Sequence, residues 1–249
     1  MTTSRLHLRS AAILALLFSN GVAHAACEVR SGPARARLVE LYTSEGCSSC
    51  PPADRWLAAF EASASMIPLA LHVDYWDDLG WRDRFADPRF GRRQRSQVAL
   101  GGASTVYTPQ VFVDGRAWSH WSRGGDLPNA AGAVPSLQLS ASKRADGTWQ
   151  PELAVDATDR GNWQAYFALV EAASSSEVSA GENRGRTLRH RHVVRAWAGP
   201  VTQWPARATL QTPQDFAQRD AAIVAFVEDA DSGRTGQALR LPLARCEAP

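Results

Sequence analysis

Lysine and net charge are both scarce in this sequence of 249 residues. Lys143 is the only lysine, and the formal net charge is only +2. Removing residues 1–25 would take away two arginines and no acidic residue, leaving 25 basic and 25 acidic side chains. A neutral chain has no electrostatic attraction for nucleic acid or for an anionic membrane, so neither is expected as a partner.

Long apolar runs and several catalytic motifs are also missing. The apolar stretch at residues 11–18 is much shorter than the about 20 residues that a membrane-spanning helix needs. The sequence has no Ser-His-Asp order, glycine-rich phosphate loop or carboxylate pair in a supporting context. Hydrolase and kinase functions therefore have no support, and no cofactor is expected.

Residues 1–25 have the three parts of a secretory signal peptide. Arg5 and Arg9 precede the apolar stretch, and Ala23-His24-Ala25 has the small-x-small pattern of a cleavage site. We therefore expect an exported protein, periplasmic or secreted, whose mature chain begins at residue 26. Such compartments are oxidising, so that disulfides form and persist there.

The four cysteines fall into two pairs. Cys47 and Cys50 form a Cys-x-x-Cys sequence, whereas Cys27 and Cys246 lie near the two ends of the mature chain. Structural zinc would need two close pairs or a histidine-rich segment, and neither is present. We expect a Cys27–Cys246 disulfide, because domain termini often lie close together. The alternative is a lipoprotein acylated at Cys27, although His24 stands where lipidation signals usually have an aliphatic residue.

The close pair of cysteines lies between an expected strand and an expected helix. Residues 38–42 are typical of a buried strand, and the two prolines after the pair suit the first turn of a helix. Residues 67–76 predict a second strand, parallel to the first. The N-terminus of the helix would lower the pKa of Cys47 below the ordinary value of about 8.5, with Glu45 opposing this weakly. Cys47 would then attack, and Cys50 would resolve the mixed disulfide.

A second segment, residues 104–117, adds a turn and a hairpin. Thr108-Pro109 precedes a short strand, and Asp114-Gly115 is a strong hairpin turn sequence. A proline directly before a strand often marks a cis peptide bond in a tight turn. We therefore expect a cis bond between Thr108 and Pro109.

A Cys-x-x-Cys that opens a helix, followed after one further strand by Thr-Pro and a hairpin, resembles the thioredoxin fold. In that family the cis-proline loop faces the cysteines, and its backbone pairs with the bound substrate chain. The resemblance implies a redox site made of Cys47, Cys50, Thr108 and Pro109. Gly46 departs from the family, which usually has an aromatic residue before the first cysteine.

Four longer segments narrow the resemblance: VELYTSEGCSSCPPAD, HVDYWDDLGWRDRFADPRFGRRQ, YTPQVFVDG and GENRGRTLRHRHVVR. Together they are similar to a family of secreted bacterial thioredoxin-like proteins that carries a domain-of-unknown-function label. The similarity extends over nearly the whole mature chain. It implies export and an α/β thioredoxin-like domain at residues 26–132, and it leaves the substrate open.

The expected function is thiol-disulfide exchange with protein thiols or disulfides. Two alternatives remain open: an inert disulfide in a non-catalytic binding protein, and Cu(I) binding by the two thiolates with His72 as third ligand. His72 and Asp74 alternate on the second expected strand and would share one face, where they could move protons or form a buried hydrogen-bonded pair. Trp76 and Trp81 could line a substrate groove or pack in the core.

A further helix is expected at residues 85–100. Asp87 suits the N-cap and Pro88 the first helical position. Its three arginines are expected on a solvated face: Arg92, Arg93 and Arg95.

Residues 133–249 predict a second domain, an antiparallel β-sandwich for which the immunoglobulin type is one model. Seven strands are expected, at residues 137–139, 153–156, 164–171, 188–197, 206–211, 221–228 and 238–243. His190 and His192 alternate within one of them, and we favour an exposed strand face over a metal pair, because no carboxylate or thiol lies nearby in the sequence.

Overall fold

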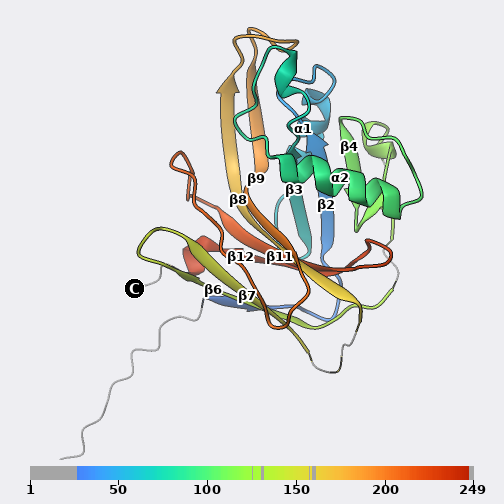
Figure 1. Ribbon diagram of the computed structural model, residues 1–249, viewed down its shortest axis with the longest axis vertical. Helices are drawn as coiled ribbons and strands as arrows, with labels where there is room; N and C mark the ends of the chain where they lie inside the picture. Colours follow the sequence, from blue (N-terminus) through green and yellow to red (C-terminus); the bar gives the residue numbers. More distant parts are fainter. Residues whose placement is uncertain (1–26, 125, 130–131, 157, 159–160, 247–249) are drawn as a thin grey trace, which may run out of the picture.

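The computed structural model describes residues 27–246, except for 125, 130–131, 157 and 159–160. The expected signal peptide therefore lies outside the described residues. Most of the regular structure is β-sheet, arranged in two sheets (Figure 1). Within the described part of the chain, no helix has the length and apolar character that crossing a membrane would require.

The larger sheet contains the strands on both sides of the Cys-x-x-Cys turn. Its eight strands have the order β12-β11-β8-β9-β3-β2-β4-β5. In chain order they are β2 (Arg37–Thr43), β3 (Met66–His72), β4 (Gln110–Val113), β5 (Arg116–Ala117), β8 (Trp163–Glu177), β9 (Thr187–Val201), β11 (Ala222–Asp229) and β12 (Thr235–Pro242). Strands β2 and β3 are parallel, and β2 and β4 are antiparallel. The expected order of strand, cysteine turn, helix and parallel strand is therefore present.

The same sheet joins the two halves of the chain. Strands β3 and β9 run parallel and pair at Ala70 and Val193. All seven strands expected after residue 133 are present, but four of them extend the sheet of β2 and β3. The β-sandwich expected after residue 133 thus shares a sheet with β2 and β3 of the N-terminal half. The reason is the length of β8 and β9, which have 15 residues each and so reach from the sandwich to the cysteine turn.

The smaller sheet forms the second layer of the sandwich. Its four strands, in the order β1-β6-β7-β10, are β1 (Glu28–Arg30), β6 (Leu137–Lys143), β7 (Trp149–Val155) and β10 (Ala206–Arg207). Buried apolar side chains such as Leu139 and Trp149 pack there against Phe167 and Ile223 of the larger sheet. Burying one such side chain contributes about 1.5–3 kcal/mol, so this interface stabilises the packing of the two sheets against each other.

Two helices, α1 (Pro51–Ala58) and α2 (Pro88–Leu100), pack on opposite faces of the larger sheet (Figure 1). Side chains alternate along β2, so Tyr42 packs in one core with Phe90 of α2, whereas Leu41 packs in another with Leu57 of α1. The core under α2 also contains Trp197 from the C-terminal half of the chain. That core is therefore common to both halves.

Helix α2 begins as expected, with Asp87 as N-cap and Pro88 at its first position. One expectation about its arginines was wrong, because Arg93 is buried rather than solvated. Its guanidinium bonds the carboxylates of Glu40 and Glu228 at 2.7 and 3.0 Å. These two carboxylates lie in the interior, where charged groups are costly unless they are paired.

The hairpin of β4 and β5 has the turn expected from Asp114-Gly115. Both residues have positive φ angles, 49° and 77°, as the favoured hairpin turn requires. A Cβ on Gly115 would lie 1.9 Å from the carbonyl oxygen of Gly233, so this position also needs glycine for space. The turn therefore brings the hairpin into direct contact with the loop between β11 and β12.

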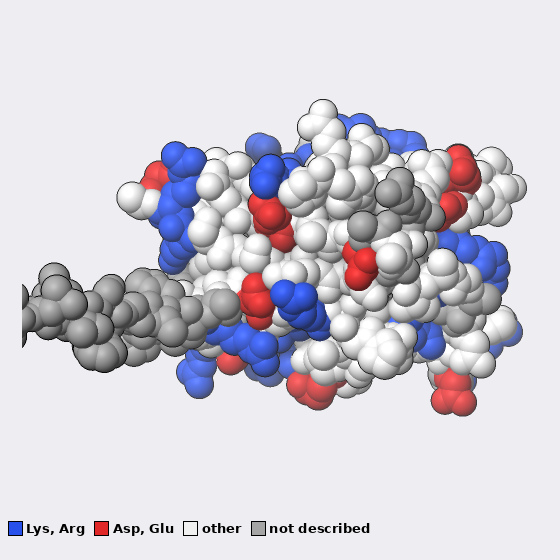
Figure 2. Space-filling model, turned by 90° about the horizontal axis from the view of Figure 1, so that it is seen from below, with Lys and Arg blue, Asp and Glu red and all other residues white. Residues whose placement is uncertain are grey.

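The ends of the described chain are joined by a disulfide. Cys27 and Cys246 are bonded, with Cα atoms 4.6 Å apart, and they are the pair expected from the sequence. On the face shown in Figure 2, basic and acidic side chains are interspersed among uncharged ones. That face carries no large surface of a single charge.

Candidate functional site

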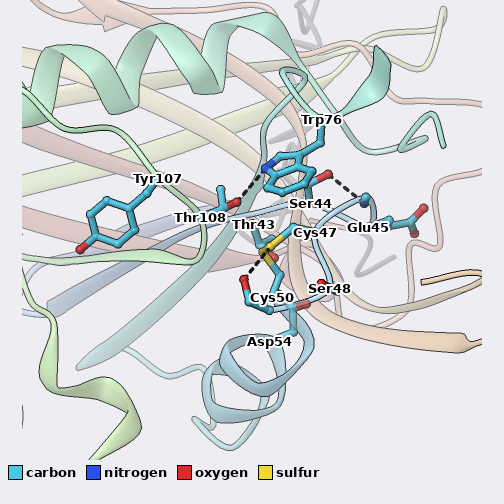
Figure 3. The surroundings of a disulfide bond; sticks show 12 residues. Thr43, Ser44, Glu45, Cys47, Ser48, Cys50, Asp54, Trp76, Tyr107 and Thr108 are labelled. Carbon is cyan, nitrogen blue, oxygen red and sulfur yellow. Dashed lines mark hydrogen bonds between the residues drawn. A yellow bond between two sulfur atoms is a disulfide. The ribbon is translucent and has the colours of Figure 1, made fainter. Parts of the chain in front are cut away.

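Cys47 and Cys50 lie in the turn between β2 and α1 and form a disulfide, with Cα atoms 5.4 Å apart (Figure 3). Strand β2 leads into the turn, and Cys50 is the N-cap residue of α1. Both cysteines are 0% exposed. Any exchange reaction must bring another sulfur atom to Cys47, so the groups that cover the turn control access to it.

Trp76 and Thr108 lie beside the disulfide, as Figure 3 shows. Trp76 Nε1 donates a hydrogen bond of 2.8 Å to Thr108 Oγ1, and the Thr108-Pro109 peptide bond is cis. A Cβ at Gly46 would lie only 3.1 Å from the Cβ of Trp76. Trp76 therefore supplies an aromatic group next to the position where the sequence has glycine.

The loop between β8 and β9 also covers the turn. The buried side-chain amide of Asn183 donates hydrogen bonds to the carbonyl oxygens of Glu45 and Cys47, at 2.8 and 3.0 Å. The N–H of Ser48 donates to the carboxylate of Glu182 at 2.9 Å. Glu182 and Asn183 were not among the site residues expected from the sequence. Their signal was that they lie in one of the four segments that carry the family resemblance.

Two buried histidine-carboxylate pairs adjoin the turn. His72 Nδ1 lies 2.6 Å from Asp83 Oδ2, His190 Nε2 lies 3.1 Å from Glu45 Oε1, and the two imidazole rings are 5.0 Å apart. Burial acts to lower the pKa of His72, but the Asp83 carboxylate outweighs it and the pKa is raised. Burial acts to raise the pKa of Glu45, but the hydrogen bond from His190 helps to hold it below its ordinary value.

These pairs correct two expectations. Strand β3 ends at His72 instead of residue 76, so Asp74 lies beyond the strand and does not share a strand face with His72. The partner of His72 is Asp83, which comes from the loop before α2. His190 and His192 are each only 3% exposed, not on an exposed face, because the β8–β9 hairpin packs against α1 and the cysteine turn.

The two tryptophans considered for a substrate groove make hydrogen bonds near the turn. Trp81 Nε1 donates to Glu45 Oε2 at 2.8 Å, and Trp76 bonds Thr108 as described above. Both indoles are partly buried. Trp81 thus helps to fix the position of the buried carboxylate, whereas Trp76 lies beside the disulfide and holds the side chain of Thr108.

Asp54 is a further acid next to the pair that sequence analysis did not single out. It lies one helical turn after Cys50, and its Oδ1 accepts a hydrogen bond of 2.8 Å from Thr43 Oγ1. Burial raises the pKa of Asp54 above its ordinary value, against the effect of His72. The second cysteine therefore has a partly buried carboxyl group close to it (Figure 3).

The copper alternative needs His72 to join the two sulfurs as a ligand. Among the residues that the structure describes, no group of three or more His, Cys, Asp or Glu side chains is placed to hold a metal ion. His72 uses Nδ1 to bond Asp83, and within the described part of the chain its Nε2 has no hydrogen-bond partner. In this structure the two sulfurs are bonded to each other, so they do not act as thiolate ligands, and copper binding stays an alternative.

The fold and site define a mostly β protein of two sheets that carries a Cys-x-x-Cys disulfide between a strand and a helix. The chain belongs to the family described as Protein of unknown function (DUF1223), whose model matches residues 38–228. This match covers the cysteine turn, the cis-proline loop and the β8–β9 loop. A search among curated proteins found no match.

Two solved structures are similar in fold. A structural-genomics target from Agrobacterium tumefaciens is 23% identical, with 85% of this chain and 96% of that chain covered and a TM-score of 0.56. HBP35 of Porphyromonas gingivalis is 15% identical, with 87% of this chain and 78% of that chain covered and a TM-score of 0.56. At these identities the likeness concerns the fold alone.

Proposed function

We propose that this protein is an exported thiol-disulfide oxidoreductase with a thioredoxin-like site, which exchanges disulfides with other proteins. The observation that carries the proposal is the position of the Cys47–Cys50 disulfide, at the start of α1 and beside the cis Thr108-Pro109 loop. A helix N-terminus favours a thiolate at the first cysteine. The signal-peptide pattern and the second disulfide support an oxidising compartment.

Each cysteine has its own role in the exchange. In the reducing direction, the Cys47 thiolate attacks one sulfur of a client disulfide, and the other client sulfur leaves as a thiolate and takes up a proton. Cys50 then loses its proton and attacks Cys47, which forms the Cys47–Cys50 bond and releases the second client thiolate to be protonated. Two electrons pass to the client, and oxidation of a client follows the same steps in reverse.

Thr108 and Pro109 are the proposed substrate-facing residues. Their loop lies beside the disulfide, with the Thr108 side chain held by Trp76. We propose that the backbone of this loop pairs with the client chain on either side of the reacting sulfur. Trp76 would then form one wall of the client-binding groove.

Substitution of each cysteine tests the proposal. Cys47→Ser should abolish reduction of insulin by the protein with dithiothreitol as electron source, whereas Cys50→Ser should accumulate mixed disulfides with client proteins. The matched control is the double variant Cys27→Ser/Cys246→Ser, which removes the other disulfide and leaves the pair intact. Wild-type protein without exchange activity, or full activity in Cys47→Ser, would contradict the proposal.

Burial of both sulfurs favours a second candidate, a structural disulfide in a non-catalytic binding protein. The reduction potential of the Cys47–Cys50 pair separates the two. An exchanging pair should have a potential between about −120 and −270 mV, whereas a structural disulfide should lie below about −300 mV.

A further inference from the structure

We infer that the Cys47–Cys50 pair reduces client disulfides rather than oxidising client thiols, and that Glu182 of the β8–β9 loop is a positioning residue that contributes to this direction. The inference rests on the proposed function and adds the direction of electron flow to it. It follows from the carboxylates that accept hydrogen bonds from backbone N–H groups of the cysteine turn.

The direction of exchange depends on how well the surrounding groups stabilise a negative charge on Cys47. The disulfide form is neutral, whereas the reduced form contains a thiolate when the first cysteine has lost its proton. Groups that stabilise the thiolate therefore stabilise the reduced form and make the disulfide a stronger oxidant. Carboxylates near the thiolate have the opposite effect, because they favour the disulfide and make the dithiol a better electron donor.

In this turn, carboxylates occupy N–H groups that could otherwise stabilise a thiolate. The N–H of Glu45 donates to Asp83 at 2.8 Å, and the N–H of Ser48 donates to Glu182 at 2.9 Å. Ser48 directly follows the attacking cysteine, so Glu182 brings its negative charge to the backbone next to that residue. Hydrogen bonds from Ser48 hold the pKa of Glu182 below its ordinary value, and the carboxylate is therefore ionised at neutral pH.

The cations around the turn do not cancel these charges. The charged groups that bond the turn or its direct partners are Glu45 in the turn, Asp54 in α1, Asp77 and Asp83 before α2, Glu182 and Arg186 in the β8–β9 loop, His72 in β3 and His190 in β9. Each imidazole is paired with a carboxylate of the cluster, and Arg186 bonds the neutral amide of Asn183. Five carboxylates therefore face three cations even when both imidazoles are protonated.

The reducing cycle needs a supply of electrons. After one turnover, Cys47 and Cys50 are a disulfide and the client has two thiols. A second dithiol protein must then attack Cys47, form a mixed disulfide and be oxidised in turn, with two protons passing to Cys47 and Cys50. The partner implied is thus an electron-donating dithiol protein of the same compartment.

The direction of exchange is tested by offering the wild-type protein both kinds of client. Reduced protein should reduce insulin disulfides in stoichiometric amount. Oxidised protein should oxidise reduced, unfolded ribonuclease no faster than oxidised glutathione does at the same concentration. Fast oxidation of ribonuclease would overturn the inference and leave the proposed function standing, whereas exchange with neither client would contradict the proposed function itself.

Glu182→Gln tests the role of the loop, because glutamine keeps the side-chain length and removes the charge. In equilibrium with dithiothreitol at low salt, this variant should shift towards the reduced form by about threefold, the scale expected of an exposed charge. The pH midpoint of Cys47 alkylation should fall by about half a unit. Both shifts should shrink at about 1 M salt, which screens exposed charges and would not alter a purely structural effect.

The matched control is Glu177→Gln, the same change on the same hairpin. Glu177 is exposed and accepts hydrogen bonds from Thr187 rather than from the cysteine turn. This variant should keep the wild-type equilibrium and alkylation profile. Equal behaviour of Glu182→Gln and Glu177→Gln, or a shift of Glu182→Gln towards the disulfide, would overturn the assignment of Glu182.

Discussion

Asp83 connects the cysteine turn to two other segments of the chain. Its carboxylate accepts hydrogen bonds from the N–H groups of Glu45 and Phe85, at 2.8 and 2.9 Å, and pairs with His72 Nδ1 at 2.6 Å. Burial acts to raise the pKa of Asp83, but His72 outweighs it and the pKa is lowered. One side chain therefore holds together the turn, the end of β3 and the loop before α2.

The opposite pKa shifts of His72 and Asp83 predict a pH dependence of stability. The raised pKa of His72 gives a contribution that is complete below the ordinary value of 6.5 and is lost as the pH rises through the folded pKa. The lowered pKa of Asp83 gives a contribution that is complete above 3.8 and is lost as the pH falls through the folded pKa. The pair therefore stabilises the fold most between these two values.

Asp83→Asn should lower the free energy of unfolding by about 3–5 kcal/mol at a pH of about 5.5, because it leaves a buried imidazolium without its partner. The loss should be smaller at a more alkaline pH, above the folded pKa of His72, because the imidazole is then neutral. Urea unfolding followed by tryptophan fluorescence measures both values. Asp78→Asn, at an exposed position of the same loop, is the control and should stay close to wild type. A loss that does not change with pH would refute the pairing.

The sequence identified His72 as a buried polar residue but not its partner. Period-two alternation pointed to Asp74, since alternation predicts which residues share a strand face. It does not predict where a strand ends, and β3 ends before Asp74 is reached. The actual partner lies 11 residues away, across a loop whose path depends on tertiary packing.

At the scale of elements, α2 is attached to the sheet by a buried cation. The guanidinium of Arg93 bonds Glu40 of β2 and Glu228 of β11, and it lies 4.4 Å from the ring centre of Tyr166 in β8. These contacts join one helix to strands from both halves of the chain. A substitution of Arg93 should therefore weaken the packing of α2 against strands from both halves of the chain.

Arg93→Met should lower the free energy of unfolding by about 3–5 kcal/mol, because it leaves Glu40 and Glu228 buried without a cation. Arg92→Met is the control on the same helix, where the side chain is exposed, and it should change stability by less than about 0.5 kcal/mol. Guanidinium chloride would screen charges, so urea unfolding is the suitable measurement. Equal stability of the two variants would mean that the buried cation contributes nothing.

The positions of the strands could be predicted from local sequence patterns, but the pairing between strands could not. Apolar runs and turn residues predicted all seven strands after residue 133, since these signals lie within each segment. Pairing of β9 with β3 joins residues more than a hundred positions apart, and no local signal encodes it. The burial of Arg93 did have a local signal: it lies three residues after Phe90 and four before Gln97, both buried on the same face.

At the scale of the whole molecule, the shared sheet makes the two halves depend on each other. Tyr166, Trp197 and Phe226 from the C-terminal half pack in one core with Tyr42 and Phe90 from the N-terminal half. Removal of β9 would also expose the edge of β3 to solvent. An unpaired edge strand and an open apolar core both favour aggregation.

A fragment of residues 27–132 should therefore not fold on its own. We expect it to lack a cooperative thermal transition and the near-ultraviolet circular dichroism of the full mature chain. Residues 27–249, purified in the same way, are the control. Cooperative unfolding of the fragment would show instead that the expected boundary near residue 133 separates two independent domains.

The Cys27–Cys246 disulfide closes the described chain into a covalent ring and joins residues with a sequence separation of 219. On the chain-entropy model, closure of so long a loop contributes about 5 kcal/mol as an upper value. In this ring the disulfide connects η3 (Leu243–Arg245) to β1, so the ring has no first or last element. A single peptide-bond cut in the β8–β9 loop would leave one continuous molecule that starts at β9, passes through the disulfide to β1 and ends at β8. A protease that made one such cleavage would rearrange the order of the chain without dividing it.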